Sequence, residues 1–117
     1  MGFWSPTMDR NQSIKILRDG SISQAKEVLS SIFVLVKSHE KQVYALELLE
    51  KKKRLKESDM IGKQLMEYNI IIEKYKTIVE NRRNPKEREQ LMTSVQATKI
   101  KIANLLAIIQ ATEQQSD

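Results

Sequence analysis

The only histidine of the chain, His39, is the first candidate for acid–base chemistry or metal binding. It has no set of acids nearby and falls within a loose apolar stripe, which predicts a structural histidine with a satisfied ring. The other residues of this stripe are Ala25, Val28, Ile32, Leu35, Val43, Leu46 and Leu49. Glu47 with Glu50, or Glu67 with Glu73, could supply carboxylates, but the Glu-x-x-His pattern of di-iron bundles is absent. The sequence also lacks a glycine-rich phosphate loop, a His pair four residues apart and a nucleophile elbow. We therefore expect no enzyme, no catalytic residues, no metal and no cofactor.

Two clusters of basic residues could bind phosphate groups. The clusters, at 51–56 and 82–88, contain Lys51, Lys52, Lys53, Arg54 and Lys56, and Arg82, Arg83, Lys86 and Arg88. Single-stranded nucleic acid usually requires stacking aromatics, and duplexes require a basic face along the phosphates. Neither cluster has an aromatic residue within five positions, and in a three-helix bundle the clusters would lie at opposite ends. Solvated helix ends are the first interpretation, and contact with nucleic acid, an acidic membrane or an acidic protein is the alternative.

The C-terminal segment carries few charges, which could suit it to binding another helix. Between Gln90 and Thr112 only Lys99 and Lys101 are charged. A stripe spaced alternately by four and three residues comprises Thr93, Ala97, Ile100, Asn104, Ala107 and Ala111. An ordinary solvated helix face carries Glu and Lys pairs instead. The stripe is therefore either a docking face for another chain or the result of a central position within its own bundle.

A second segment with few charges, residues 21–36, contains only Lys26 and Glu27 as charged residues. We expect Ile32 and Val36 of this segment to bind a partner, together with the C-terminal stripe. The partner is predicted to be another protein chain, by helix–helix packing, with a homo-oligomer as the first expectation.

The composition predicts helices. The 117 residues include 40% hydrophobic residues but only three Gly and two Pro, too few turn residues for a protein of many short strands. The net charge is +5, and the basic excess is concentrated in the middle third. No cysteine, no signal peptide and no apolar run of about 20 residues is present, so we expect a cytoplasmic or nuclear location.

The last helix has a clear predicted start. Asn84 is a suitable cap, Pro85 suits the first helical position and Glu87 follows three residues after the cap. Two segments repeat apolar residues at the four–three spacing of a helix packed on a neighbour. These residues are Ile61, Leu65, Tyr68, Ile72, Tyr75 and Val79, then Leu91, Val95, Thr98, Ile102, Leu105 and Ile109.

Residues 21–83 form either one helix or two. One unbroken helix would extend roughly 93 Å, more than twice the roughly 42 Å of the last helix, so its first half would need an oligomer for cover. A break at 57–59, with Ser58 as a cap and Gly62 in the next turn, would instead give three helices of similar length. We favour an all-α antiparallel bundle of three long helices, with a short leading helix as a further element.

The chain is predicted to hold one domain, residues 21–117, preceded by a tail and turn at 1–20. Phe3 and Trp4 in the tail either cover an apolar groove of the bundle or anchor a partner.

Overall fold

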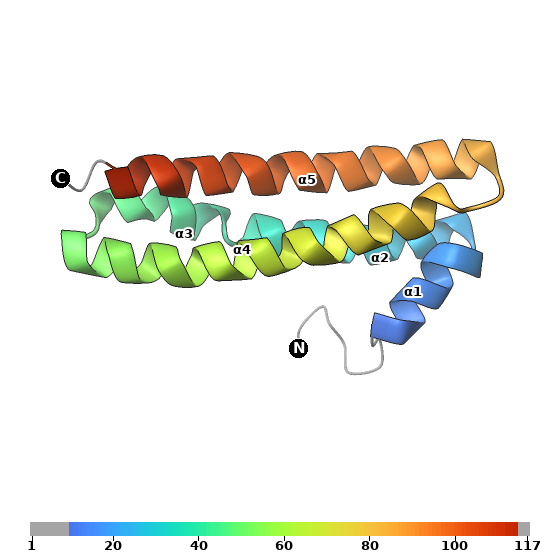
Figure 1. Ribbon diagram of the computed structural model, residues 1–117, viewed down its shortest axis with the longest axis horizontal. Helices are drawn as coiled ribbons and strands as arrows, with labels where there is room; N and C mark the ends of the chain where they lie inside the picture. Colours follow the sequence, from blue (N-terminus) through green and yellow to red (C-terminus); the bar gives the residue numbers. More distant parts are fainter. Residues whose placement is uncertain (1–9, 115–117) are drawn as a thin grey trace.

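The computed structural model describes residues 10–114, and these form helices with no strand among them (Figure 1). The elements are α1 (Arg10–Asp19), α2 (Ile22–Ser38), α3 (Glu40–Ala45), the short 3₁₀ turn η1 (Leu46–Leu48), α4 (Lys51–Glu80) and α5 (Pro85–Gln114). The all-α prediction is confirmed. Phe3 and Trp4 lie outside the described residues.

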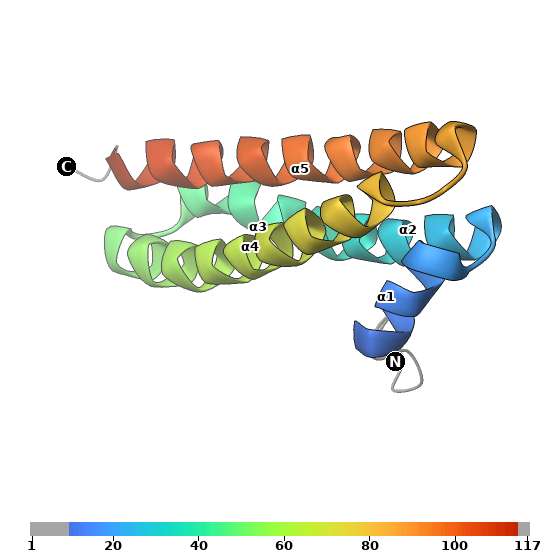
Figure 2. The same ribbon diagram turned by 45° about the vertical axis from the view of Figure 1, so that its right-hand side comes forward.

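Helices α4 and α5 are each 30 residues long and lie side by side in opposite directions (Figures 1 and 2). Helices α2 and α3 follow one another on the same side of α5 as α4, behind α4 in Figure 1, and α1 packs against α2 and α4 at the end of the molecule where α5 begins. The molecule is 51 Å long and 17 Å thick. Helix α5 thus contacts three other helices, which leaves its remaining face outside the bundle.

The chain between α2 and α4 breaks earlier than predicted. Helix α4 runs without interruption through residues 57–59 and Gly62, so both the break near 57 and the single helix over 21–83 are wrong. The break lies at η1 and Glu50, where the backbone becomes extended. Ser58 is buried inside α4, and its hydroxyl donates to the Leu55 carbonyl at 3.0 Å and to Glu113 Oε2 at 2.9 Å. These bonds satisfy the side chain within the helix, so it does not act as a cap.

The predicted start of α5 is confirmed. Pro85 is its first residue, and Asn84 Oδ1 accepts hydrogen bonds from the backbone N–H groups of Lys86 at 2.9 Å and Glu87 at 3.2 Å. These bonds satisfy amides that have no partner within the helix. The start of α5 is therefore determined by local sequence.

The predicted apolar stripes form the core. Each of the two long helices buries its stripe, with Tyr68 only half-buried, and the stripe that contains His39 is buried except at Leu35, His39 and Leu49, which are partly buried. The buried residues of the three predicted stripes are Ala25, Val28, Ile32, Val43 and Leu46; Ile61, Leu65, Ile72, Tyr75 and Val79; and Leu91, Val95, Thr98, Ile102, Leu105 and Ile109. Helix α1 adds Leu17 to this core.

Candidate interaction surface

The face of α5 turned away from the core carries no charged side chain over most of its length. From Gln90 to Gln114, in a helix that the structure describes completely, every exposed side chain is uncharged. We call these residues the outer strip: Gln90, Thr93, Gln96, Ala97, Ile100, Ala103, Asn104, Ala107, Gln110, Ala111 and Gln114. These residues share one face of α5 because of the helical period, and the buried residues of α5 recur on the opposite face.

The two lysines of this stretch point to the sides of α5 and are held by other helices. Lys101 Nζ lies 2.8 Å from Glu40 Oε2 of α3, and Lys99 forms an ion pair with Glu73 of α4. Hydrogen bonds from these lysines lower the pKa of Glu40 and of Glu73, and the bond to Glu40 raises the pKa of Lys101. The ion pairs keep both ammonium groups at the flanks of the strip.

The outer strip combines one large apolar side chain with several small ones. Ile100 is 58% exposed, and Ala97, Ala103 and Ala107 lie within one or two turns of it. Small side chains let the axis of a second helix approach closely, since the distance between helix axes depends on the side chains at the contact. Internal packing does not account for this composition, because the strip faces away from the helices that contact α5.

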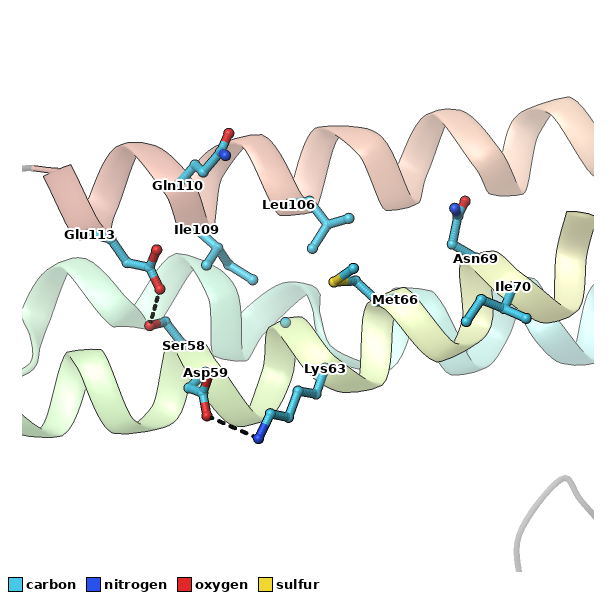
Figure 3. Close-up of a pocket in the computed structure, with 11 residues that line it drawn as sticks. Ser58, Asp59, Lys63, Met66, Asn69, Ile70, Leu106, Ile109, Gln110 and Glu113 are labelled. Carbon is cyan, nitrogen blue, oxygen red and sulfur yellow. Dashed lines mark hydrogen bonds and ion pairs between the residues drawn. The ribbon is translucent and has the colours of Figure 1, made fainter.

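A groove between α4 and α5 adjoins the strip (Figure 3). Its volume is about 580 Å³, and Met66 and Leu106 point toward each other across it. Met66 and Ile70 of α4 are 59% and 61% exposed, so they add apolar surface beside α5. At one end the Ser58–Glu113 hydrogen bond and the ion pair of Lys63 with Asp59, at 3.4 Å, close the apolar part with polar groups.

Met66 and Ile70 are not among the partner-binding residues predicted from the sequence. They lie four residues apart and outside the buried stripe of α4, so they belong to a second face of that helix. The four-residue spacing of Met66 and Ile70 is the feature of the sequence that could have identified this second face. Whether the face is part of a binding surface depends on which helix lies beside it, and only the packing of α4 on α5 shows this.

The placement of Ile32 and Val36 on a docking face is wrong for this fold. Both side chains are 0% exposed, because α2 turns them toward the core that it shares with α5. They stabilise the bundle and are out of reach of a partner. The other predicted partner-binding residues, Ala97, Ile100, Asn104, Ala107 and Ala111, all lie exposed on the outer strip.

The first residue of the second basic cluster, Arg82, is buried in the fold. Arg82 is 6% exposed, and its guanidinium donates to the carbonyls of Leu17 at 2.8 Å and of Gly20, at the end of α1. It also lies 3.0 Å from Glu87 Oε1. Arg82 therefore fixes α1 to the start of α5 and cannot serve as part of a basic patch, whereas Arg83 is exposed.

The first basic cluster lies at the other end of α4, as the sequence predicted. Lys51, Lys52, Lys53 and Lys56 are exposed, and Arg54 is partly buried. The first three residues open α4, where the positive end of the helix dipole repels cations. The clusters at 51–56 and 82–88 do not form one surface, because α4 separates them along its length (Figure 1).

His39 has two partners. Its Nδ1 lies 2.8 Å from Gln42 Oε1, and its Nε2 lies 3.3 Å from the Tyr68 hydroxyl, with the two rings 5.7 Å apart. These contacts join the α2–α3 corner to α4. Within residues 10–114, no three His, Asp or Glu side chains gather as metal ligands would.

The comparisons with known proteins give no relative: no family model, no curated protein and no solved structure matches this chain. No helix in the described part of the chain has the length and apolar character needed to span a bilayer.

Proposed function

We propose that the protein is a non-enzymatic interaction module that binds another protein chain, by helix–helix packing, through the outer strip of α5 and the adjoining groove. The observation that carries the proposal is that the outer strip of α5, from Gln90 to Gln114, contains no charged residue. A partner covering this strip would not have to desolvate a charged group, which is the largest cost of burying a surface. Apolar burial would contribute about 25 cal/mol per Å².

The groove supports the same proposal. Met66 and Ile70 extend the apolar surface from α5 onto α4, beside a face that is already uncharged. Exposed apolar side chains that gather next to one another mark interaction sites more often than isolated ones do. Methionine suits such a surface because its flexible side chain adapts to the shape of a partner.

Site-specific photo-crosslinking in cells that express the protein tests the proposal. A photoreactive residue at Ala107 of the strip should give discrete protein adducts, whereas the same residue at Glu67, exposed on α4, should not. Adducts at both positions, or at neither, would contradict the proposal.

The Ala107→Arg substitution tests the role of the strip, with the photoreactive residue moved to Ala103, which is also exposed on the strip. Ala107 is exposed, so the substitution should leave the helical content of the purified protein, measured by circular dichroism, unchanged, while the adducts formed in cells from position 103 should disappear. Loss of helix would mean that the position supports the fold, and the strip would then not be a docking face.

The alternative is a basic adaptor that contacts nucleic acid or an acidic membrane through 51–56 and 82–88. One observation favours it at the first cluster, where Lys51, Lys52 and Lys53 add their charge to the positive end of α4. Such binding should weaken by orders of magnitude between about 50 and 200 mM salt, whereas binding through the outer strip should not. The burial of Arg82 reduces the support for the second cluster.

A further inference from the structure

We infer that the partner of the outer strip is a second copy of this chain, packed antiparallel to the first with Ile100 near the two-fold axis. This inference rests on the proposed function and names its partner. It stands on three observations: the shape of the strip, its spacing and the distribution of charge around it.

The strip contains both a projecting side chain and a space that fits it. Ile100, at 58% exposure, is its one large aliphatic side chain. A side chain that packs between two helices enters a space formed by residues j, j+3, j+4 and j+7 of its neighbour. Residues Ile100, Ala103, Asn104 and Ala107 have this spacing and are all exposed. Because three of the four are small or short, the strip can receive the isoleucine of a copy while its own isoleucine enters that copy.

The spacing of the strip is the same in both chain directions. Thr93, Ala97, Ile100, Asn104, Ala107 and Ala111 are separated by four, three, four, three and four residues. In an antiparallel pair centred at residue 102, Ala97 of one copy lies opposite Ala107 of the other, and Ile100 lies opposite Asn104. Such a contact uses the same surface on both subunits and closes with two-fold symmetry.

The charges around the strip favour the antiparallel direction. In a parallel pair, Glu89 would lie beside Glu89 of the copy, and the two α5 helices would align their dipoles. In the antiparallel pair, the positive end of each α5 meets the negative end of the other. The strip itself adds no charge to the contact, and Lys101, which flanks it near the two-fold axis, is paired with Glu40 of its own copy.

The size of the strip indicates a weak dimer. A helix face about 37 Å long and about 12 Å wide, with the edge of the groove, would bury roughly 1,000 Å² over both copies, the low end for specific interfaces. The net charge of each copy opposes association, so salt should strengthen the dimer by screening this repulsion. This dependence is opposite to that of binding to phosphate.

Sedimentation velocity of the full 117-residue chain between about 5 and 500 μM tests the inference. The mass should rise from 13.6 kDa toward twice that value, and more steeply as salt is added. Ile100→Glu should reduce the association constant by about tenfold or more, because it buries an unpaired charge. The matched control is Met60→Glu on α4, since Met60 is similarly exposed, at 55%, and lies outside strip and groove. A monomer at every concentration, or a dimer that Ile100→Glu leaves intact, would overturn the inference.

Cysteine crosslinking tests the direction, because the chain has no cysteine of its own. A mixture of Ala97→Cys and Ala107→Cys chains should oxidise mainly to the mixed dimer, and each variant alone should crosslink poorly. Efficient crosslinking of Ala107→Cys chains alone would overturn the antiparallel arrangement. If the protein stays monomeric and Ala107 captures a foreign chain in the photo-crosslinking experiment, this inference fails and the proposed function stands. If Ala107 captures nothing, both fail.

Discussion

Helices α4 and α5 have the same length and lie against each other, yet their outer faces differ. Both bury a stripe at the four–three spacing, and both contribute to one core. The exposed face of α4 carries charges along its length, among them Lys63, Glu67 and Lys74. The exposed face of α5 carries none from Gln90 to Gln114. The core requires only the buried side of each helix, so the difference must be explained by what lies outside the core.

The comparison also separates two kinds of exposed apolar residue. Met60 of α4 lies among charged neighbours, as single exposed hydrophobic residues often do in soluble proteins. Met66 and Ile70 lie beside the groove that leads to α5. Ile100 lies at the middle of the uncharged strip. The exposed apolar residues of the proposed interaction surface therefore differ from Met60 in lying on or beside α5, and not in how exposed they are.

The largest expected effect separates the two faces of α5 itself. Leu105 is 1% exposed, so Leu105→Ala should lower the free energy of unfolding by about 3 to 4 kcal/mol, from lost apolar contacts and a cavity. Its neighbour Asn104 is exposed on the strip, and Asn104→Ala should change the value by less than about 0.5 kcal/mol. Urea unfolding measures both. A large loss in Asn104→Ala would mean that the strip helps to hold the fold, and the contrast between the faces would disappear.

The next effect separates two neighbouring arginines at the end of α4. Arg82→Ala leaves the Leu17 and Gly20 carbonyls and the Glu87 carboxylate without their donor, so it should cost about 2 to 3 kcal/mol. Arg83 is exposed, and Arg83→Ala should be nearly neutral. Urea unfolding tests this prediction as well. Equal effects of the two substitutions would contradict the structural role of Arg82.

Arg82 illustrates what the sequence can and cannot predict in this chain. The cap at Asn84, the start of α5 at Pro85 and the three buried stripes were predictable, because they depend on residues close together in the chain. The role of Arg82 depends on carbonyls more than 60 residues away, at the end of α1. Nothing near Arg82 in the sequence identifies those acceptors, so it resembled an ordinary member of a basic cluster.

The same distinction explains the other differences. Ser58 has the residue type of a helix cap, but its hydroxyl is satisfied by Leu55 and by Glu113 of α5, so α4 continues. The stripe containing Ala107 was predictable as one face of a helix. Its exposure could not be predicted, because it depends on α4, α2 and α3 all packing on the opposite face of α5. Ile32 and Val36 were assigned from low local charge, which does not distinguish a buried face from an exposed one.

A smaller effect concerns the groove, which Gly62 of α4 helps to line. A Cβ atom at Gly62 would meet no atom within 4 Å, so Gly62→Ala should raise the free energy of unfolding by roughly 0.5 to 1 kcal/mol through better helix propensity. The control is Gly20→Ala, where a Cβ would lie 2.7 Å from the Ile16 carbonyl oxygen and should destabilise the protein. Thermal unfolding of the two variants should shift the midpoint in opposite directions. A loss of stability in Gly62→Ala would mean that the groove is less open than the structure shows.

The smallest expected effect is the pH dependence of the ion pairs that keep the lysines of α5 away from the strip. The pKa of Glu40 and that of Glu73 are lowered from 4.5 by hydrogen bonds from Lys101 and Lys99, so the folded state binds these protons less tightly than the unfolded state does. Their stabilisation is complete above pH 4.5 and is lost as the pH falls through the lowered values. The pKa of Lys101 is raised above 10.5 by its hydrogen bond with Glu40. The stabilisation from Lys101 is therefore complete below pH 10.5 and is lost as the pH rises through the raised pKa of the folded state.

Removing one carboxylate should flatten the acid side of this profile. Glu40→Gln should make the urea midpoint fall less steeply between pH 5 and about pH 3 than it does in the unsubstituted protein. The variant also releases the Lys101 ammonium, which then adds a mobile positive charge beside Ala97 and Asn104. Self-association should therefore weaken in Glu40→Gln even at neutral pH, because a like charge on each copy approaches the same interface. An unchanged acid slope would show that the ion pair does not hold Lys101, and the lack of charge on the strip would then need another cause.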